Sequence, residues 1–391
     1  MKSPSRSNRV VAVTVLAALS CLSASFARDV DQQPRASDAL DVIRYKIDAE
    51  VDPAQFKLIA RSAVTLRLGA ASRSVVLELN GSLVVSRVLD ASTNQPLEFL
   101  QDRLDQVNVR IDLGKAAEAG TELTLIFEYA GELRTAEGGP IPDKRLAYVG
   151  PEGSYLFYAG RWFPFHEYAS DRASYEINLT APQGLSLAGF SEQPITIKPV
   201  TEVKEPVAQE KPPVAQEKPT ITRRRAPASR GKAPPGPAGA ATGQPTPPTG
   251  QPPAPAQDKA VYTLQCSQAV LPGSLAIGKY ITREVKAAGR FTVEFFFKPG
   301  DEGRIDQLAE PISQMLEVYS SRFGRYQFGD RLRIAEIDND SLDYYSGPGV
   351  LFLAPRVLAS DQPIDLGRLA REVAYQWWGQ AVALRSFDDV W

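Results

Sequence analysis

The sequence of 391 residues is poor in the side chains that bind transition metals, since it contains one histidine and two cysteines. Most catalytic zinc sites use two or three imidazoles, and a four-thiolate site needs four cysteines. Any general-base scheme that requires histidine has a single candidate, His166. Neither sign of charge dominates, because 44 basic and 46 acidic side chains give a formal net charge of −2. This balance excludes the strongly basic surface that is typical of nucleic-acid-binding proteins.

Long apolar runs are also scarce. The run near the N-terminus, Val10–Leu19, is shorter than the roughly 20 residues that a membrane-spanning helix needs. Positive side chains precede it at Lys2, Arg6 and Arg9, and Ser25-Phe26-Ala27 follows it as a small-x-small cleavage site. This pattern predicts a signal peptide over residues 1–27 and a periplasmic or extracellular protein without a transmembrane helix after cleavage.

The two cysteines depend on the same cleavage. Removal of residues 1–27 takes away Cys21 and leaves Cys266 without a second cysteine, so the mature chain is expected to have no internal disulfide. Cys21 could instead carry a lipid, although the leucine at position 19 lies one place away from its usual position in a lipobox. Lipid attachment at Cys21 therefore stays open as an alternative.

Between about Asp41 and Leu133, apolar and polar side chains alternate with a period of two. The expected inward-facing sets are Tyr45, Ile47, Ala49 and Val51; Val64, Leu66 and Leu68; Val107, Val109, Ile111 and Leu113; and Leu123, Leu125, Phe127 and Tyr129. Turn residues such as Asn80-Gly81 separate these runs. The alternation predicts half-buried antiparallel strands that form a β-sandwich.

The composition changes sharply over residues 201–258, which hold 14 of the 31 prolines and no aromatic residue. Such a segment buries too little apolar surface to offset its chain entropy, and we expect it to be disordered. Strand-like sequences flank it at Ile195–Ile197 and Val261–Leu264, so it is predicted to be a greatly enlarged hairpin loop. Its second half is basic and is either a solvated spacer or a site for an anionic envelope surface. The positive side chains there are Arg223, Arg224, Arg225, Arg230 and Lys232.

After residue 300 the apolar period becomes helical. The spacing of Ile305, Leu308, Ile312, Leu316 and Tyr319 predicts a helix that Gly324 ends, with a break or kink near Pro311. A strand is expected over Arg331–Ile337 and a second helix over Asp365–Gly379.

The second helix contains the sequence Arg371-Glu372-Val373-Ala374-Tyr375-Gln376-Trp377-Trp378-Gly379-Gln380. It resembles the zinc-binding helix of the aminopeptidase N family, whose usual form is His-Glu-x-x-His-Gln-Trp-Phe-Gly-Asn. The ending Phe387–Trp391 is similar to that family's Trp-Trp-Asp-Asp-Leu-Trp stretch. Further similarities to the family occur in Trp162–Tyr168 with Ala173–Tyr175, in Leu271–Ala276, and in Phe323–Phe328.

The resemblance implies a mainly β N-terminal sandwich followed by a partial α+β thermolysin-like domain. It places the sandwich at residues 41–300, interrupted by the loop 201–258. It also implies an incomplete thermolysin-like peptidase domain at residues 301–391.

The resemblance also assigns the catalytic positions. The two zinc-binding histidines correspond to Arg371 and Tyr375, while the general base is present as Glu372. The glutamate that holds the substrate's amine corresponds to Ser346, in Asp343–Gly347. The third ligand would lie three residues beyond Trp391, and the oxyanion-binding tyrosine would lie further downstream.

These replacements predict a protein without zinc or another cofactor, in which Glu372 is idle. A carboxylate cannot generate a nucleophile from water whose pKa no metal has lowered. Rescue of a site by His166 is not expected, because that residue belongs to the sandwich. Arg371 and Glu372 are adjacent on the helix and point in different directions, so their adjacency does not imply an ion pair.

The tryptophans of the same helix have two interpretations. Core packing of Trp377 and Trp378 is favoured over a role in lining a ligand pocket. Because the family's fold would continue beyond this chain, the two tryptophans are also expected to form an exposed apolar patch with Phe387 and Trp391.

Three functions remain open. The first is an exported pseudo-peptidase that serves as a binding or structural module for an unknown protein or peptide. The second is the N-terminal part of a zinc-dependent aminopeptidase truncated before its third ligand, which does not explain Arg371, Tyr375 and Ser346. The third is an envelope-attachment protein that uses the basic loop. The sequence does not choose a ligand or an oligomeric state.

Overall fold

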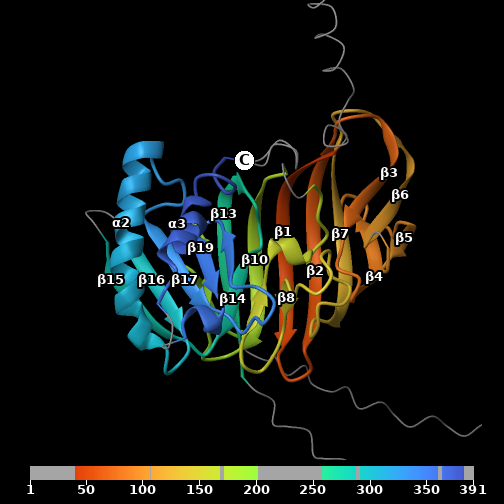
Figure 1. Ribbon diagram of the computed structural model, residues 1–391. Coiled ribbons are helices and arrows are strands. Elements are labelled where there is room, and N and C mark those ends of the chain that lie inside the picture. Colours follow the sequence, from red (N-terminus) through yellow and green to blue (C-terminus); the bar gives the residue numbers. More distant parts are fainter. Residues whose placement is uncertain are drawn as a thin grey trace, which may run out of the picture. The chain divides into compact units, whose positions relative to one another are not determined.

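The computed structural model describes residues 40–105, 107–167, 171–200, 258–287, 291–359 and 363–382. The predicted signal peptide, Cys21, the basic side chains of the 201–258 segment and Phe387–Trp391 lie outside these residues. Within them the fold is mainly β, as expected, with two α-helices beside the sheets (Figure 1). No described helix is both long enough and apolar enough to cross a membrane.

The largest sheet has seven strands in the order β12-β13-β10-β1-β2-β7-β4. They are β12 (Thr196–Pro199), β13 (Lys259–Val270), β10 (Ala173–Pro182), β1 (Leu40–Asp52), β2 (Lys57–Leu68), β7 (Glu122–Glu132) and β4 (Leu83–Asp90). All neighbours pair antiparallel except β1 and β10, which are parallel. The predicted inward sets of β1 and β2 are buried, with Ile47, Val64 and Leu66 fully shielded from solvent. The period-two alternation therefore identified these strands correctly.

The predicted hairpin around the proline-rich segment is present. Strands β12 and β13 pair antiparallel, with Thr196 opposite Thr263 and Ile197 opposite Tyr262. The backbone N–H of Val200 donates to the carbonyl of Lys259 at 2.9 Å. The long segment is thus inserted between two residues that already face each other across a hairpin.

Two smaller sheets contribute to the apolar core. The three-stranded sheet has the order β3 (Ser72–Glu78), β6 (Asn108–Ala117) and β5 (Phe99–Asp102). The four-stranded sheet has the order β11 (Ser186–Gly189), β14 (Leu275–Gly278), β9 (Ser154–Leu156) and β8 (Ala147–Tyr148). A 3₁₀ turn, η2 (Tyr158–Gly160), follows β9. Leu77 and Ile111 of the three-stranded sheet belong to the same buried cluster as Ile47 and Phe127 of the seven-stranded sheet. The two sheets therefore share one core, as the predicted sandwich requires.

A five-stranded mixed sheet forms the remaining part. Its order is β15 (Ile281–Lys286), β16 (Thr292–Phe297), β17 (Arg331–Glu336), β19 (Val350–Leu353) and β18 (Tyr344–Gly347). The three central strands are parallel, and both outer strands are antiparallel to their neighbours. The sheet draws strands from both sides of residue 300, where the sequence placed a domain boundary; that division stays a prediction.

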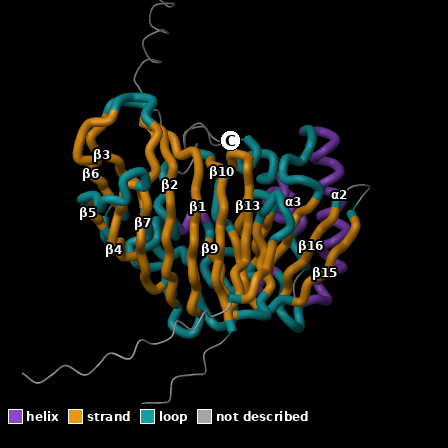
Figure 2. The backbone as a smooth tube through the Cα atoms, turned by 180° about the vertical axis from the view of Figure 1, so that it is seen from behind, coloured by secondary structure: helices purple, strands orange, loops and turns teal. Residues whose placement is uncertain are grey.

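The two faces of this sheet have different partners. Helices α2 (Ile305–Phe323) and α3 (Leu366–Ala374) lie on one face (Figures 1 and 2). On the other face, Phe296 and Phe352 pack with Tyr155 and Phe157 of the four-stranded sheet region. Two short 3₁₀ turns, η3 (Glu302–Arg304) and η4 (Pro355–Val357), complete the described elements.

The helices differ in detail from the sequence prediction. Helix α2 runs from Ile305 to Phe323 with Pro311 inside it, so the chain does not leave the helix at the proline. Helix α3 ends at Ala374, five residues before the predicted end. Its start is well defined, because the Asp365 side chain accepts from the backbone N–H of Arg368 at 3.0 Å and caps the helix.

Candidate functional site

Glu372 lies near the C-terminal end of α3 and is 7% exposed. Ser346, on the edge strand β18, donates from Oγ to the backbone carbonyl of Glu372 at 3.0 Å. The same hydroxyl lies 3.5 Å from Oε2 of that side chain. The fold therefore brings together the two positions that the family resemblance assigned to the general base and the amine-binding residue.

Burial raises the pKa of Glu372 above its ordinary value, and the charges of Arg371 and Arg368 oppose this effect. Arg371 Nη2 lies 3.5 Å from Glu372 Oε1, so the two neighbours form an ion pair that their adjacency on the helix did not imply. The Arg371 side chain is 69% exposed and long enough to bend back across the end of the helix. The pair joins an exposed guanidinium to a buried carboxylate and places a positive charge beside it.

Tyr375 follows the last residue of α3, and its N–H still donates to the carbonyl of Arg371 at 3.1 Å. Its side chain is 41% exposed. Arg371 and Tyr375 thus occupy successive turns, as the two histidines of a zinc helix would. In place of two imidazoles, they supply a guanidinium and a phenol.

The next carboxylate, Asp343, is already engaged. Arg356 and Arg368 each form an ion pair with one of its oxygens. Burial alone would raise the pKa of Asp343, but the hydrogen bonds from these arginines hold it below its ordinary value. The Arg368 guanidinium also lies over the Tyr344 ring, 5.0 Å from its centroid. Asp343 is therefore held as a charged partner of two arginines.

This donor set does not fit a zinc ion. Zinc in proteins is bound by thiolates, imidazoles and carboxylates. The two carboxylates of this region, Glu372 and Asp343, are each paired with arginine, and no thiolate or imidazole lies among the described side chains that contact Glu372. In the part of the chain that the structure describes, no group of three or more His, Cys, Asp or Glu side chains could hold a metal. The roles assigned to Glu372, Arg371, Tyr375 and Ser346 stay predictions.

Two glutamines hold this region together, and the sequence reasoning gave them no role. Gln376 is 1% exposed; its Oε1 accepts from the Gly349 N–H at 2.9 Å and its Nε2 donates to the Gly347 carbonyl at 2.9 Å. Gln380 Nε2 donates to the Ser346 carbonyl at 2.9 Å. One signal in the sequence could have indicated the role of Gln376. It directly precedes Trp377 and Trp378, and a polar side chain beside buried tryptophans needs hydrogen-bond partners.

Trp377 packs in the core, as favoured from the sequence. It is 5% exposed, its Nε1 donates to the Gly324 carbonyl at 3.0 Å, and its ring lies near those of Tyr319 and Tyr326. Its predicted place in an exposed apolar patch is therefore wrong, because α2 covers it. Trp378 is half-buried against Phe323, with ring centroids 4.1 Å apart.

His166 has partners of its own. Its Nδ1 lies 3.0 Å from Oδ2 of Asp171, whose carboxylate also accepts from the Val42 N–H. Burial raises the pKa of Asp171, and the hydrogen bond and charge of His166 oppose this. Val42 belongs to β1 and Asp171 precedes β10, two interior strands of the large sheet. Among the described residues, no hydrogen bond or ion pair joins His166 to Glu372.

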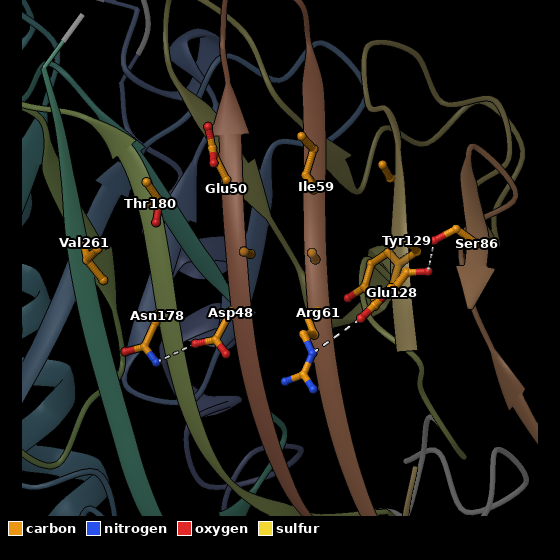
Figure 3. A pocket seen from close by; sticks show the side chains of 13 residues that line it. Asp48, Glu50, Ile59, Arg61, Ser86, Glu128, Tyr129, Asn178, Thr180 and Val261 are labelled. Atoms are coloured by element: carbon orange, nitrogen blue, oxygen red, sulfur yellow. Dashed lines mark hydrogen bonds and ion pairs between the residues drawn. The ribbon is translucent and has the colours of Figure 1, made fainter. Parts of the chain in front are cut away.

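A separate hollow of about 650 Å³ opens on the outer face of the seven-stranded sheet (Figure 3). Its carboxylates have polar or charged partners: the neutral amide of Asn178 donates from Nδ2 to Asp48 at 2.8 Å, and Arg61 lies 3.7 Å from Glu128. Lys259 neutralises Glu50 in the same way. This face therefore presents a mixed polar surface without a convergent set of reactive groups.

Neither the models of known protein families nor the sequences of curated proteins match this chain. Solved structures do match it. The M1 zinc metallopeptidase from Deinococcus radiodurans is 17% identical with a TM-score of 0.55, and the match covers 88% of this chain and 65% of that one. This chain has the fold of the N-terminal region of an M1 zinc metallopeptidase.

A mutant two-domain M1 zinc metallopeptidase bound to L-tryptophan is similar to the same extent, at 18% identity and a TM-score of 0.54. That match covers 88% of this chain and 66% of the other. The resemblance of the sequence to the aminopeptidase family is thus confirmed for the fold. The M1-like chain spans just under two thirds of the length of these relatives.

Proposed function

We propose that this protein is an exported pseudo-peptidase: an M1-type scaffold that binds a peptide or protein without hydrolysing it. The observation that carries this proposal is the arrangement around Glu372, where a guanidinium and a phenol, Arg371 and Tyr375, lie one helical turn apart. The family resemblance assigns these two positions to the zinc-binding histidines. In this interpretation, the five-stranded sheet with α2 and α3 corresponds to the first part of a thermolysin-like domain.

The chemistry supports loss of catalysis rather than a changed reaction. Hydrolysis in metallopeptidases depends on a metal that lowers the pKa of its bound water and polarises the carbonyl. The Arg371 guanidinium repels a cation from the place where the metal would be bound. Ser346 also replaces the carboxylate that would hold a substrate's amine, and its hydroxyl is used to bind the Glu372 backbone.

The test is metal analysis of the purified mature chain together with an assay on aminoacyl-nitroanilides. We expect less than stoichiometric zinc after exposure to excess zinc and removal of unbound metal, and no hydrolysis that a chelator abolishes. A double variant, Arg371→His with Tyr375→His, supplies two imidazoles beside Glu372 and should retain more zinc than the unaltered chain. Stoichiometric zinc in the unaltered chain, or chelator-sensitive hydrolysis by it, would instead support a zinc-dependent aminopeptidase.

Export is a separate part of the proposal and rests on the sequence of residues 1–27. Expression with cell fractionation and N-terminal sequencing tests it. We expect the mature protein outside the cytoplasm with Arg28 as its first residue. An intact N-terminus in the cytoplasmic fraction would contradict export, and a lipid on Cys21 would contradict cleavage after Ala27.

A further inference from the structure

A cavity of about 760 Å³ lies where the connection between β11 and β12 faces strands β15, β16 and β17. None of its lining residues belongs to α3 or β18, so it is distinct from the Glu372 region. Its apolar wall consists of Leu187, Phe190, Ile195, Ile197, Phe296 and Phe328. Most of the rest of the lining is polar or charged and includes Glu294, Arg331 and Arg333. The volume lies within the range of small-molecule binding sites, in which polar groups fix the orientation of a ligand against an apolar wall.

Arg333 lines the polar end of the cavity and has few protein partners. Its side chain is only 11% exposed, and its Nε lies 3.3 Å from Oε2 of Glu294. Among the described residues, no acceptor receives a hydrogen bond from its guanidinium, although that group has five N–H donors. Burial lowers the pKa of Arg333, and the charge of Glu294 opposes this.

Glu294 is shared between two arginines, because Arg331 Nη1 lies 3.4 Å from the same Oε2. Arg331 has a second carboxylate partner in Glu284, on the neighbouring strand β15. Arg331 thus has two carboxylate partners, whereas Arg333 has, in the described part of the chain, only Glu294, which it shares with Arg331. An anion in the cavity can supply further hydrogen-bond acceptors to the Arg333 guanidinium.

We propose that this cavity binds a small amphipathic monocarboxylate, with the carboxylate on Arg333 and the apolar body against Phe190 and Phe328. The two phenylalanine rings meet edge to face with centroids 5.4 Å apart and form a continuous apolar wall. A planar carboxylate matches the fork of the guanidinium.

The other charges restrict the ligand to a single negative charge. Glu192 and Asp330 line the same cavity and would repel a dianion. The Glu192 carboxylate is already bound by Ser267, whose N–H and Oγ donate at 2.8 and 2.7 Å. It therefore has little capacity left to bind a cationic ligand in place of the anion.

The experiment uses the full chain and dansyl-L-phenylalanine, whose fluorescence rises in an apolar site, together with its uncharged amide. We expect the acid to bind at least about tenfold more tightly than the amide, since hydrogen bonds to a charged group are the stronger kind. Arg333→Met removes the charge and the guanidinium and keeps most of the apolar stem of the side chain. It should abolish the preference for the acid while leaving the affinity for the amide nearly unchanged.

Ile197→Trp provides a second variant that does not touch the charges. Ile197 is 55% exposed at the cavity wall, so a larger side chain can fill the cavity without repacking the core, and both probes should bind more weakly. Arg87→Met, in an exposed ion pair of the large sheet, is the matched control and should leave binding unchanged. Equal affinity for acid and amide in the unaltered chain, or unchanged binding in Ile197→Trp, would overturn the proposal even if Arg333→Met did not fold.

Discussion

Gln376 bonds to the backbone of Gly349, whose N–H donates to its Oε1 at 2.9 Å. The same amide also reaches the Gly347 carbonyl, so one side chain spans the turn between β18 and β19. This turn precedes the strand that packs beside β17 at the centre of the five-stranded sheet. The glutamine of the family-like motif therefore has a structural task here that does not depend on a metal.

Replacement of this side chain is expected to be costly. Gln376→Leu leaves a buried N–H and a buried carbonyl without their partners and should lower the free energy of unfolding by about 2–4 kcal/mol. Gln314→Leu is the control, because Gln314 is exposed on α2 and bonds only to Glu310. It should change stability by less than about 0.5 kcal/mol. Denaturant unfolding measures the stability of both variants. Equal losses would contradict a structural role for the Gln376 hydrogen bonds across the β18–β19 turn.

The two adjacent tryptophans should respond differently to the same substitution. Trp377→Phe removes the hydrogen bond to the Gly324 carbonyl and leaves a void beside Tyr319 and Tyr326, so we expect a loss of about 1–3 kcal/mol. Trp378→Phe should cost less, because that ring is only half-buried. Thermal unfolding monitored by circular dichroism compares them. A larger loss of stability for Trp378→Phe than for Trp377→Phe would show that Trp378, and not Trp377, is the more important tryptophan of the core.

Glu336 predicts a pH dependence of stability. It is 1% exposed, and burial raises its pKa to about 7, although the Lys298 N–H donates to its Oε2 at 2.8 Å. Because this pKa lies above that of the unfolded chain, its contribution to stability falls as pH rises from about 4.5 to 7 and then stays low.

Glu336→Gln removes the charge and retains an oxygen for the Lys298 N–H. It should raise the free energy of unfolding by about 2–3 kcal/mol at pH 8 and change it little at pH 4. Glu310→Gln, at an exposed position of α2, is the control. A Glu336→Gln variant that is no more stable than the unaltered chain at pH 8 would show that burial does not disfavour the charged form of Glu336.

The hairpin geometry predicts that the proline-rich segment can be removed. Val200 and Lys259 already face each other, so Asn-Gly in place of residues 201–258 supplies the two-residue turn that such a hairpin prefers. We expect an unchanged circular dichroism spectrum and a stability gain of up to about 2 kcal/mol from the shorter loop. Loss of the fold would show that the segment contributes to the core. Ala-Ala at the same place is the control for turn chemistry.

Local patterns predicted most of the elements. Alternation placed β1, β2, β6 and β7, because half-buried strands need one apolar face. The spacing from Ile305 to Tyr319 found α2, and the paired strand-like sequences found the β12–β13 hairpin. The end of α3 was missed because apolar residues continue through Trp378. Gly379, with φ of 118°, instead closes a tight turn after the helix.

The sites were less accessible from the sequence, since they depend on contacts between distant residues. The family resemblance assigned separate roles to Ser346 and Glu372, which stay predictions, and the hydrogen bond between them could not be read from the sequence. Nothing local indicated that Gln376 binds Gly349 or that Arg333 faces a cavity. Arg333 follows the same alternation as an ordinary exposed strand residue, and only the cover supplied by residues 190–197 buries it.

The parallel pairing of β1 with β10 has a consequence for folding kinetics. Ser174 Oγ donates to the Ile43 carbonyl across 131 positions of the chain, and β13 must then join β10 from beyond the long insertion. The centre of the large sheet therefore consists of contacts with high sequence separation, which slow folding. During synthesis, the hydrogen-bonding edge of β1 that will receive β10 stays open until well over a hundred further residues have emerged. Over that interval a chaperone that shields exposed strands would have its largest effect on the yield of this protein.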